Sequence, residues 1–393
     1  MKWSWKLGTV AGIGIFVHWT FLILIGWIVL SDVVRGAQHN QPANRILAEA
    51  LEGTLYIVAI FACIVLHELG HALTARRYGV RTQDITLLPI GGVARLERMP
   101  EDPIQEFWIA VAGPAVNVAI AIGLSGVLLV LGSGVAFFSM PSITIDVFER
   151  FDKFLMQLLW VNLFLVGFNA IPAFPMDGGR VLRAVLAHFS GDYVRATQVA
   201  ASIGQMLAIA LGFFGLFATN PFLVFIALFV YLGAQEEAHL VQMRSLMKGL
   251  PVRAAMMTRF RALSPDDSLA VATSELLASA QQDFPVVSDG RVVGLLRRGD
   301  VISALGDSGG GRVGDVMQTD CGTVADTEML ASTFQRMRDS GCSALPVVHD
   351  ERLVGLITLE NVGELMMINS ALGRARSQRA EISDAGSSPT QPL

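Results

Sequence analysis

The chain has 393 residues, of which 52% are hydrophobic and 16% charged. A mean hydropathy of +0.52 indicates a membrane protein, and charged residues become frequent only after about residue 235, where a soluble part is expected to begin. The net charge of −5 and the lack of a basic tract argue against a nucleic-acid partner. Cys63, Cys321 and Cys342 are too few and too scattered for a disulfide framework, so we expect each to pack in a core.

Six segments are long and apolar enough to cross a bilayer, which takes about 20 helical residues. We expect these spans near residues 9–31, 53–75, 105–131, 154–172, 198–217 and 220–236. The first is too long for a signal peptide and is expected to stay uncleaved. Most Arg and Lys residues fall in the connections on one side, and positive charge belongs inside the cell. Both termini are therefore expected in the cytoplasm, with the second and fourth spans running inward.

The second expected span contains the run His67-Glu68-Leu69-Gly70-His71. Helical residues four apart share a face, so the two imidazoles can converge on one Zn²⁺ while Glu68 lies beside the open coordination position. Ionisable side chains at membrane depth are costly unless they pair or bind metal. The run predicts two zinc ligands and a base near the cytoplasmic leaflet; a satisfied polar cluster is the alternative.

The fourth expected span ends in the run Asn169-Ala-Ile-Pro-Ala-Phe-Pro-Met-Asp177-Gly-Gly-Arg180. It runs in the same direction as the second span, so its end lies at a comparable depth. A peptidase zinc usually takes three protein ligands, and Asp177 is the acidic residue placed to be the third. The prolines end the helix, and we expect the Gly pair to form a sharp turn that aims the carboxylate inward. An Asp before Gly-Gly can also be only a turn residue.

These two motifs, in this order, resemble the site-2 protease family of intramembrane zinc metalloproteases over about residues 1–240. The resemblance implies that His67, His71 and Asp177 hold the zinc and that Glu68 is the catalytic base. It also implies that Asn169 is a polar group near the scissile carbonyl.

A third motif of the family appears as Ala112-Gly-Pro-Ala-Val-Asn117. Asn117 is either a polar contact between helices or a contact of the active site. Residues 85–97 hold two short strand-like runs around a Gly pair, which indicates a hairpin. The hairpin is either an edge that receives the substrate as an added strand or an ordinary connection. For His18 we favour a hydrogen bond to the bundle interior over a role as metal ligand.

The second half contains an internal repeat with a constant offset of 61 residues, from Val252 to Val313 and from Gly294 to Gly355. Two copies of one α/β unit are therefore expected to stack on each other. The pattern resembles a tandem cystathionine-β-synthase (CBS) domain pair, a module that binds adenosine compounds such as ATP or AMP in other proteins.

In the CBS family, a hydroxyl residue and an acid contact the phosphate and ribose. The first copy keeps the acid, Asp300, but has Arg297 in place of the hydroxyl residue; the second keeps the hydroxyl residue, Thr358, but has Asn361 in place of the acid. An adenosine ligand at Asp300, Thr358 and Asn361 and a purely structural or dimerising module both remain open.

The expected fold is a membrane all-α domain of six transmembrane helices with a small membrane-associated β hairpin, followed by an α/β tandem CBS pair. We place the membrane domain at residues 1–240, the CBS domains at 249–308 and 312–370, and a disordered tail at 371–393. The expected function is cleavage of single-span proteins in or near the lipid bilayer of a prokaryotic plasma (inner) membrane, with the CBS pair as a cytoplasmic regulator and possible site of homodimerisation. A CBS-gated transporter and a catalytically inactive scaffold are the alternatives. A transporter would need paired acids or inverted repeats within the spans, which this sequence does not show, and an inactive scaffold would have lost Glu68 or a ligand.

Overall fold

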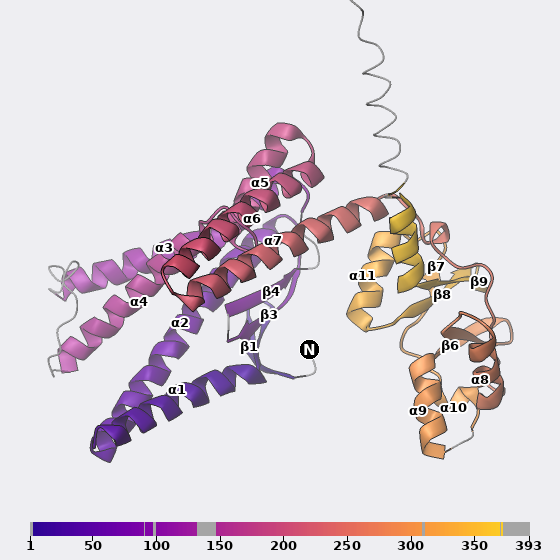
Figure 1. Cartoon of the computed structure of the whole chain (residues 1–393), viewed down its shortest axis with the longest axis horizontal. Helices are drawn as coiled ribbons and strands as arrows, with labels where there is room; N and C mark the ends of the chain where they lie inside the picture. Colours follow the sequence, from indigo (N-terminus) through magenta and orange to yellow (C-terminus); the bar gives the residue numbers. More distant parts are fainter. Residues whose placement is uncertain are drawn as a thin grey trace, which may run out of the picture. The chain divides into compact units, whose positions relative to one another are not determined.

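The computed structural model describes residues 3–89, 91–96, 100–131, 147–308, 311–369 and 371. The chain divides into two compact units, Met1–His239 and Leu240–Leu393 (Figure 1). Apart from residue 371, the tail expected at 371–393 lies outside the described residues.

The first unit is mainly helical. Among the described residues, six helices are long and apolar enough to cross a membrane. They are α1 (Trp19–Gln38), α2 (Ala43–Arg77), α3 (Pro103–Val130), α4 (Val147–Asn169), α6 (Tyr193–Phe217) and α7 (Pro221–Met247). The shorter α5 (Asp177–Ser190) lies between α4 and α6 in the chain. The six spans that the sequence predicted are confirmed, and the protein is a multi-pass membrane protein.

The start of the first span was predicted wrongly. Residues expected to begin a helix at position 9 instead form an antiparallel hairpin of β1 (Ser4–Val10) and β2 (Ile13–His18). Ala11 and Gly12 form its two-residue turn, both with positive φ (51° and 85°), as turns that match the twist of a hairpin require. α1 begins only at Trp19. His18 is its N-cap and bonds to the backbone N and Oγ1 of Thr20, so it makes a local contact and not the expected one with the bundle interior.

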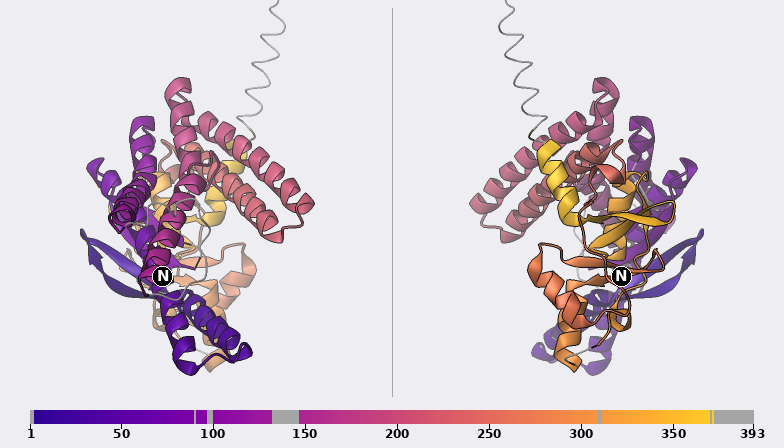
Figure 2. Two further views of the ribbon diagram at one scale, coloured as in Figure 1. Left: turned by 90° about the vertical axis from the view of Figure 1, so that its left-hand side faces the viewer. Right: turned by 90° about the vertical axis from the view of Figure 1, so that its right-hand side faces the viewer.

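The predicted hairpin before α3 is present as β3 (Thr82–Leu88) and β4 (Gly91–Leu96). It belongs to a four-stranded sheet with the order β1-β2-β3-β4, in which β2 and β3 are parallel. Ile13 and Ile85 pack with Leu69 and Ala72 of α2 in one buried cluster. The sheet therefore packs against the part of α2 that carries the two histidines. Figure 2 shows the indigo strands of the first hairpin at the edge of the ribbon diagram.

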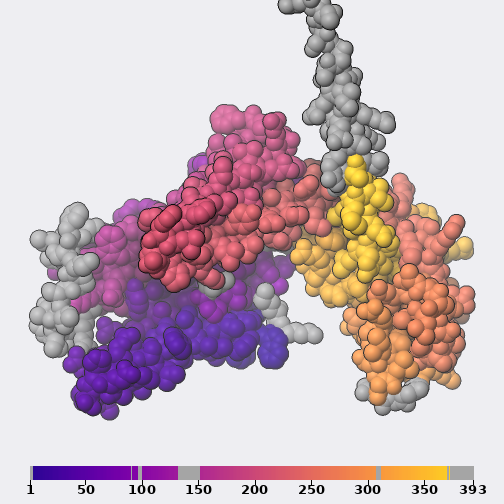
Figure 3. Space-filling view, viewed as in Figure 1, coloured from indigo at the N-terminus to yellow at the C-terminus, as the bar shows by residue number. Residues whose placement is uncertain are grey.

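α5 is fixed by a buried charge cluster. The fully buried guanidinium of Arg183 donates to the carboxylate of Glu106 on α3 and to Glu237 on α7, and it lies 4.8 Å from the ring centre of Phe174. A buried charge is tolerated only when it is paired in this way. The cluster ties α5, which begins at Asp177, to α3 and α7. The crimson residues of α6 and α7 lie at the front of the space-filling view in Figure 3.

The second unit contains the two copies of the repeat. The first comprises α8 (Leu269–Ala278), β5 (Asp283–Ser288), β6 (Arg291–Arg297) and α9 (Arg298–Ser308). The second comprises α10 (Val313–Val316), β7 (Val324–Ala325), α11 (Leu330–Ser340), β8 (Ala344–His349), β9 (Arg352–Thr358) and a helical segment at 359–369.

The copies exchange backbone hydrogen bonds in a symmetric way. Met257, which precedes the first copy's strands, pairs with Leu356 in β9, and Gln318 pairs with Leu295 in β6. These two bridges are related by the repeat offset. Each copy therefore completes the other, which confirms the predicted stacking.

Two of the cysteines pack in a core, as expected, and are also bonded to each other, which was not expected: Cys342 lies in a buried hydrophobic cluster and Cys321 packs against it. Cys321 and Cys342 form a disulfide with Cα atoms 6.0 Å apart, whereas Cys63 is free and buried, as expected. The first copy holds the corresponding segments together without a covalent bond: Gln281, the counterpart of Cys342, bonds to the backbone N and O of Arg261 at 2.7 and 2.9 Å. The pairing could not be inferred from cysteine count because it depends on the fold of the copy.

Candidate metal centre

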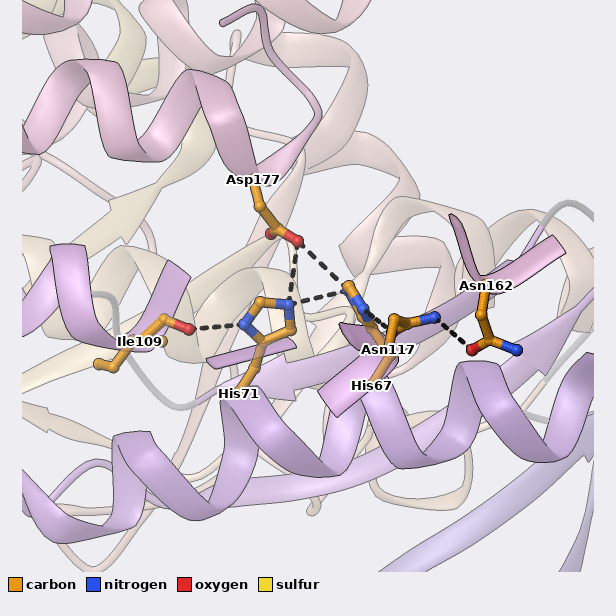
Figure 4. Close-up of polar contacts among 6 residues, drawn as sticks. All are labelled: His67, His71, Ile109, Asn117, Asn162 and Asp177. Carbon is orange, nitrogen blue, oxygen red and sulfur yellow. Dashed lines mark hydrogen bonds and ion pairs between the residues drawn. The ribbon is translucent and has the colours of Figure 1, made fainter. Parts of the chain in front are cut away.

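Three side chains from two helices converge at the centre of the first unit. His67 and His71 lie one turn apart on α2, and Asp177 is the first residue of α5; all three are buried. The Nε2 atoms of the two histidines are 3.0 Å apart, and Oδ2 of Asp177 lies 3.2 and 3.1 Å from them (Figure 4). Among the described residues, these three are the group of His, Cys, Asp or Glu side chains whose ligand atoms lie close enough together to hold a metal ion, all within 4.8 Å of one another.

Each histidine uses its other ring nitrogen to contact a fixed acceptor. Nδ1 of His71 lies 2.6 Å from the backbone carbonyl of Ile109 on α3. A carbonyl oxygen can only accept a hydrogen bond, so the proton of His71 must be on Nδ1. Its Nε2 is then an unprotonated lone pair that faces Asp177.

The orientation of His67 is set by a relay of two buried asparagines. Asn162 on α4 donates through Nδ2 to the carbonyl of Leu158 at 2.8 Å, which leaves its Oδ1 to accept from Nδ2 of Asn117 at 3.1 Å. Oδ1 of Asn117 then faces Nδ1 of His67 at 2.7 Å (Figure 4). Because the relay begins on a carbonyl, every later donor is determined, and the proton of His67 must also be on Nδ1.

With both imidazoles neutral, two ring lone pairs and a carboxylate oxygen face one another at about 3 Å. Three acceptors at this spacing repel unless a cation lies among them. Tetrahedral zinc with ligand distances of 2.0–2.1 Å places its ligand atoms about 3.3 Å apart, close to the separations of 3.0, 3.1 and 3.2 Å here. The donor set and its spacing fit zinc.

Glycine lets the helices of the site approach closely. A Cβ at Gly113 of α3 would lie 2.1 Å from Nε2 of His71 and 2.7 Å from Nε2 of His67, and a Cβ at Gly70 of α2 would lie 2.7 Å from the carbonyl oxygen of Ala112. Such contacts are not possible for a side chain. Gly113 therefore provides the space for the cluster, a role that the sequence motif did not reveal.

The Gly pair after Asp177 has a different role from the expected one. Gly178 and Gly179 lie in the first turn of α5 and do not form a sharp turn before it. A Cβ at Gly178 would lie 2.3 Å from the carbonyl oxygen of Ile171, and a Cβ at Gly179 would lie 2.6 Å from the backbone of Ala173. The pair lets the proline-containing segment fold closely over the start of α5, which carries Asp177 into the cluster.

The other predicted residues occupy several places. The side chain of Glu68 lies beside β4, where a Cβ at Gly92 would be 2.9 Å from its Cγ. Asn169, the last residue of α4, and Asp177 line the same pocket of about 380 Å³. Asn117, for which the sequence left two roles open, contacts both His67 of the cluster and Asn162 on another helix. Asn162 was missed; its only signal is an amide inside an apolar span.

The residues singled out in the repeat lie in the second unit. Asp300 accepts from Arg297 at 3.0 Å and from Gln318 at 3.4 Å. Thr358 bonds to the side chain and the backbone N of Asn361 at 2.9 and 3.1 Å. The first copy thus holds an ion pair where the second holds a hydroxyl and an amide.

Comparison with known proteins identifies the family. The chain is 32% identical over 368 residues to the zinc metalloprotease MJ0392 of Methanocaldococcus jannaschii, a match that covers 94% of this chain and 97% of that protein. The profile of peptidase family M50 matches residues 55–211. The chain belongs to peptidase family M50, the site-2 protease family. It is a zinc metalloendopeptidase, as the sequence predicted.

Three further matches belong to this comparison. The putative zinc metalloprotease Rip3 of Mycobacterium tuberculosis is 30% identical over 389 residues, which cover 93% of each chain. The solved site-2 protease from Methanocaldococcus jannaschii is 36% identical, with a TM-score of 0.40, and covers 60% of this chain and 95% of that one. The CBS domain profile matches residues 252–307 and 313–366, which confirms the repeat pair.

A first prediction concerns Gly113. Gly113→Ala is expected to abolish zinc binding, because its Cβ would occupy the space of the histidine Nε2 atoms. Zinc content of the purified protein, measured by mass spectrometry, is the test. Gly123→Ala on the same helix is the matched control, since no atom lies within 4 Å of that Cβ. A full zinc complement in Gly113→Ala would contradict the packing described.

A second prediction concerns the asparagine relay. Asn162→Leu removes the acceptor of the Asn117 amide, so His67 loses its fixed orientation and zinc affinity should fall about 10- to 100-fold. Competition with a chelator measures this affinity. Gln157→Leu, an exposed position on the same helix, should leave it unchanged. Equal affinities in the two variants would show that the relay does not orient the ligand.

Proposed function

We propose that this membrane metalloprotease cleaves single-span membrane proteins within or near the bilayer. The observation that carries the proposal is the position of the acceptor cluster: its two histidines lie on a helix long and apolar enough to span a membrane, and Glu68 on that helix faces strand β4. A substrate that reaches this cluster must come from the membrane or its surface.

His67, His71 and Asp177 would hold the zinc. When bound, zinc lowers the pKa of a coordinated water toward about 7 and polarises a carbonyl oxygen. Glu68 lies next to the ligand histidines in sequence and would accept the proton of the attacking water and pass it to the leaving amine. Asn169 lines the same pocket as Asp177, and its amide would donate a hydrogen bond near the scissile carbonyl.

Strand β4 would bind the substrate backbone. A transmembrane substrate arrives as a helix in which the carbonyls are hydrogen-bonded, so it must be extended before an amide can be cut. β4 is the end strand in the sheet order, and its Gly92 contacts the side chain of Glu68. Addition of the extended segment to β4 would satisfy its backbone groups beside the base.

The third prediction separates the base from the ligand. Glu68→Gln should keep zinc but lose about 10²- to 10⁴-fold in cleavage rate, because a general base is removed. Asp177→Ala should lose zinc itself. Zinc content and cleavage of a single-span reporter in proteoliposomes measure the two effects. Equal zinc loss in both variants would remove Glu68 from the role proposed.

We also propose that both termini are cytoplasmic in a prokaryotic plasma (inner) membrane. The basis is the charge at one end of these spans: Arg76 and Arg77 end α2, and Arg81 and Arg95 lie between α2 and α3. Positive charge next to spans is retained on the cytoplasmic side. The zinc cluster, in the second half of α2, would then lie toward the cytoplasmic leaflet.

The fourth prediction tests this orientation. A cysteine introduced at His39, between α1 and α2, should react with an impermeant maleimide added to intact cells, whereas one introduced at Arg81 should react only after lysis. Both positions are exposed. The cysteines are introduced into a chain in which Cys321 and Cys342 are replaced by serine, because this orientation places both in the reducing cytoplasm, whereas Cys63 is buried and can remain. Reversed labelling would place the site at the outer leaflet.

The CBS pair would regulate the protease through an adenosine ligand bound at Asp300, Thr358 and Asn361. The proposed zinc ligands and base all precede residue 180, so the pair is not needed for the chemistry. A ligand can shift activity only by its differential affinity for two arrangements of the pair.

The fifth prediction follows from this. The full-length enzyme should change its cleavage rate on addition of ATP or AMP, and a chain ending at His239 should keep zinc and cleave the same bond without such a response. Rates with and without nucleotide, together with calorimetric binding to the full-length chain, are the measurements. A full-length enzyme that neither binds nor responds to either compound would make the pair a docking or dimerisation element.

A further inference from the structure

The pocket beside Asp177 is large for a gap between packed helices. It has a volume of about 380 Å³, within the range of small-molecule sites. α3 forms one wall and α5 the other, and the end of α4 closes the third side. The apolar residues that α3 and α5 contribute to the lining are Ala110, Val111, Pro114, Val181, Leu182 and Val185, and Ala170 and Pro172 follow the end of α4.

The two polar residues of the pocket are Asn169 and Asp177. Any group inside it therefore lies next to the metal cluster. Gly92 of strand β4 lies beside the side chain of Glu68, and Asp177 lines the pocket, so the strand and the pocket both border the site. A side chain close to the cut bond has this apolar recess available to it.

We propose that this pocket is a specificity subsite that binds one large apolar side chain, leucine or phenylalanine in class, of the substrate near the scissile bond. The inference rests on the proposed protease function and deepens it. The occupant is a substrate side chain and not a lipid chain, because the pocket includes the side chains of Asn169 and Asp177, which a lipid chain would leave facing hydrocarbon. A side chain next to a peptide group brings polar atoms to that end of the pocket and apolar atoms to the rest.

The residues that set the size of the subsite are Val111 on α3 and Val185 on α5. Val111 is half-buried and Val185 is exposed at the rim, so each can be enlarged without removing a core contact. Neither belongs to the metal cluster or its hydrogen-bond relay. Phenylalanine at either position would fill the recess from a different wall.

The experiment is a specificity profile of the holoenzyme. A single-span substrate is prepared with Ala, Leu, Phe or Trp at each of the three positions on either side of the cut bond. The wild type should cleave Leu or Phe better than Ala at one position by about 10- to 100-fold in kcat/KM, the range that an apolar pocket can provide. Val111→Phe and Val185→Phe should lose this preference at that position, so that kcat/KM for the Leu and Phe substrates falls to the value for the Ala substrate.

Val118→Phe is the matched control. Val118 lies on α3, is 40% exposed and does not line the pocket. The Val118→Phe enzyme should therefore show the same substrate preference as the wild type. Zinc content is measured for every variant, which separates a blocked subsite from a damaged metal centre.

Each of four outcomes would overturn the proposal. A flat wild-type profile would show that no subsite of this kind exists, while the protease function would stand on the loss of cleavage in Glu68→Gln. An unchanged preference in both Val111→Phe and Val185→Phe would place the subsite elsewhere. An equal loss on all substrates with zinc retained would indicate a lipid or packing role. A zinc-loaded wild type that cleaves no single-span substrate would instead refute the proposed function together with the subsite.

Discussion

A histidine offers one ring nitrogen to a cation only when its proton is on the other. In this protein that condition is met twice inside a membrane domain, where each misplaced polar group is costly. Nδ1 of His71 contacts the carbonyl oxygen of Ile109. The relay from His67 through Asn117 and Asn162 ends on the carbonyl oxygen of Leu158. Neither oxygen can donate a hydrogen bond. α3 and α4 thus determine what α2 presents to the metal. The catalytic motif on α2 would not form the site without these two neighbouring helices.

The elements that the sequence predicted share one property: their signal is local. The run from His67 to His71 defines a helix face, and the six spans are defined by length and apolar composition. The repeat was visible because its offset is constant. Asp177 required one longer-range argument, the common direction of two spans, and its proximity to both histidines shows that span topology can substitute for missing contact information.

The features that escaped prediction depend on contacts between distant segments. Residues 9–18 are as apolar as the span that follows, and hydropathy alone does not separate a strand from a helix there; only the Ala11-Gly12 turn differs. Asn162 resembles any amide in a span until α4 is placed beside α3. Gly113 is one of 38 glycines, and its role appears only when the nitrogen atoms next to it are located. The Cys321–Cys342 bond depends in the same way on how the second copy folds.

The exchanged bridges of the repeat have a consequence for biosynthesis. Met257 precedes the strands of the first copy, yet its backbone partner is Leu356 in the last strand of the second. When only the first copy has left the ribosome, Met257 has no backbone partner, and the edge of β6 that later pairs with Gln318 is also unpaired. The bridges between the two copies, and with them the stacked pair, therefore form only after nearly all of the chain has been made. The membrane helices that precede it are complete well before then, so the protease domain is synthesised ahead of the module proposed to control it.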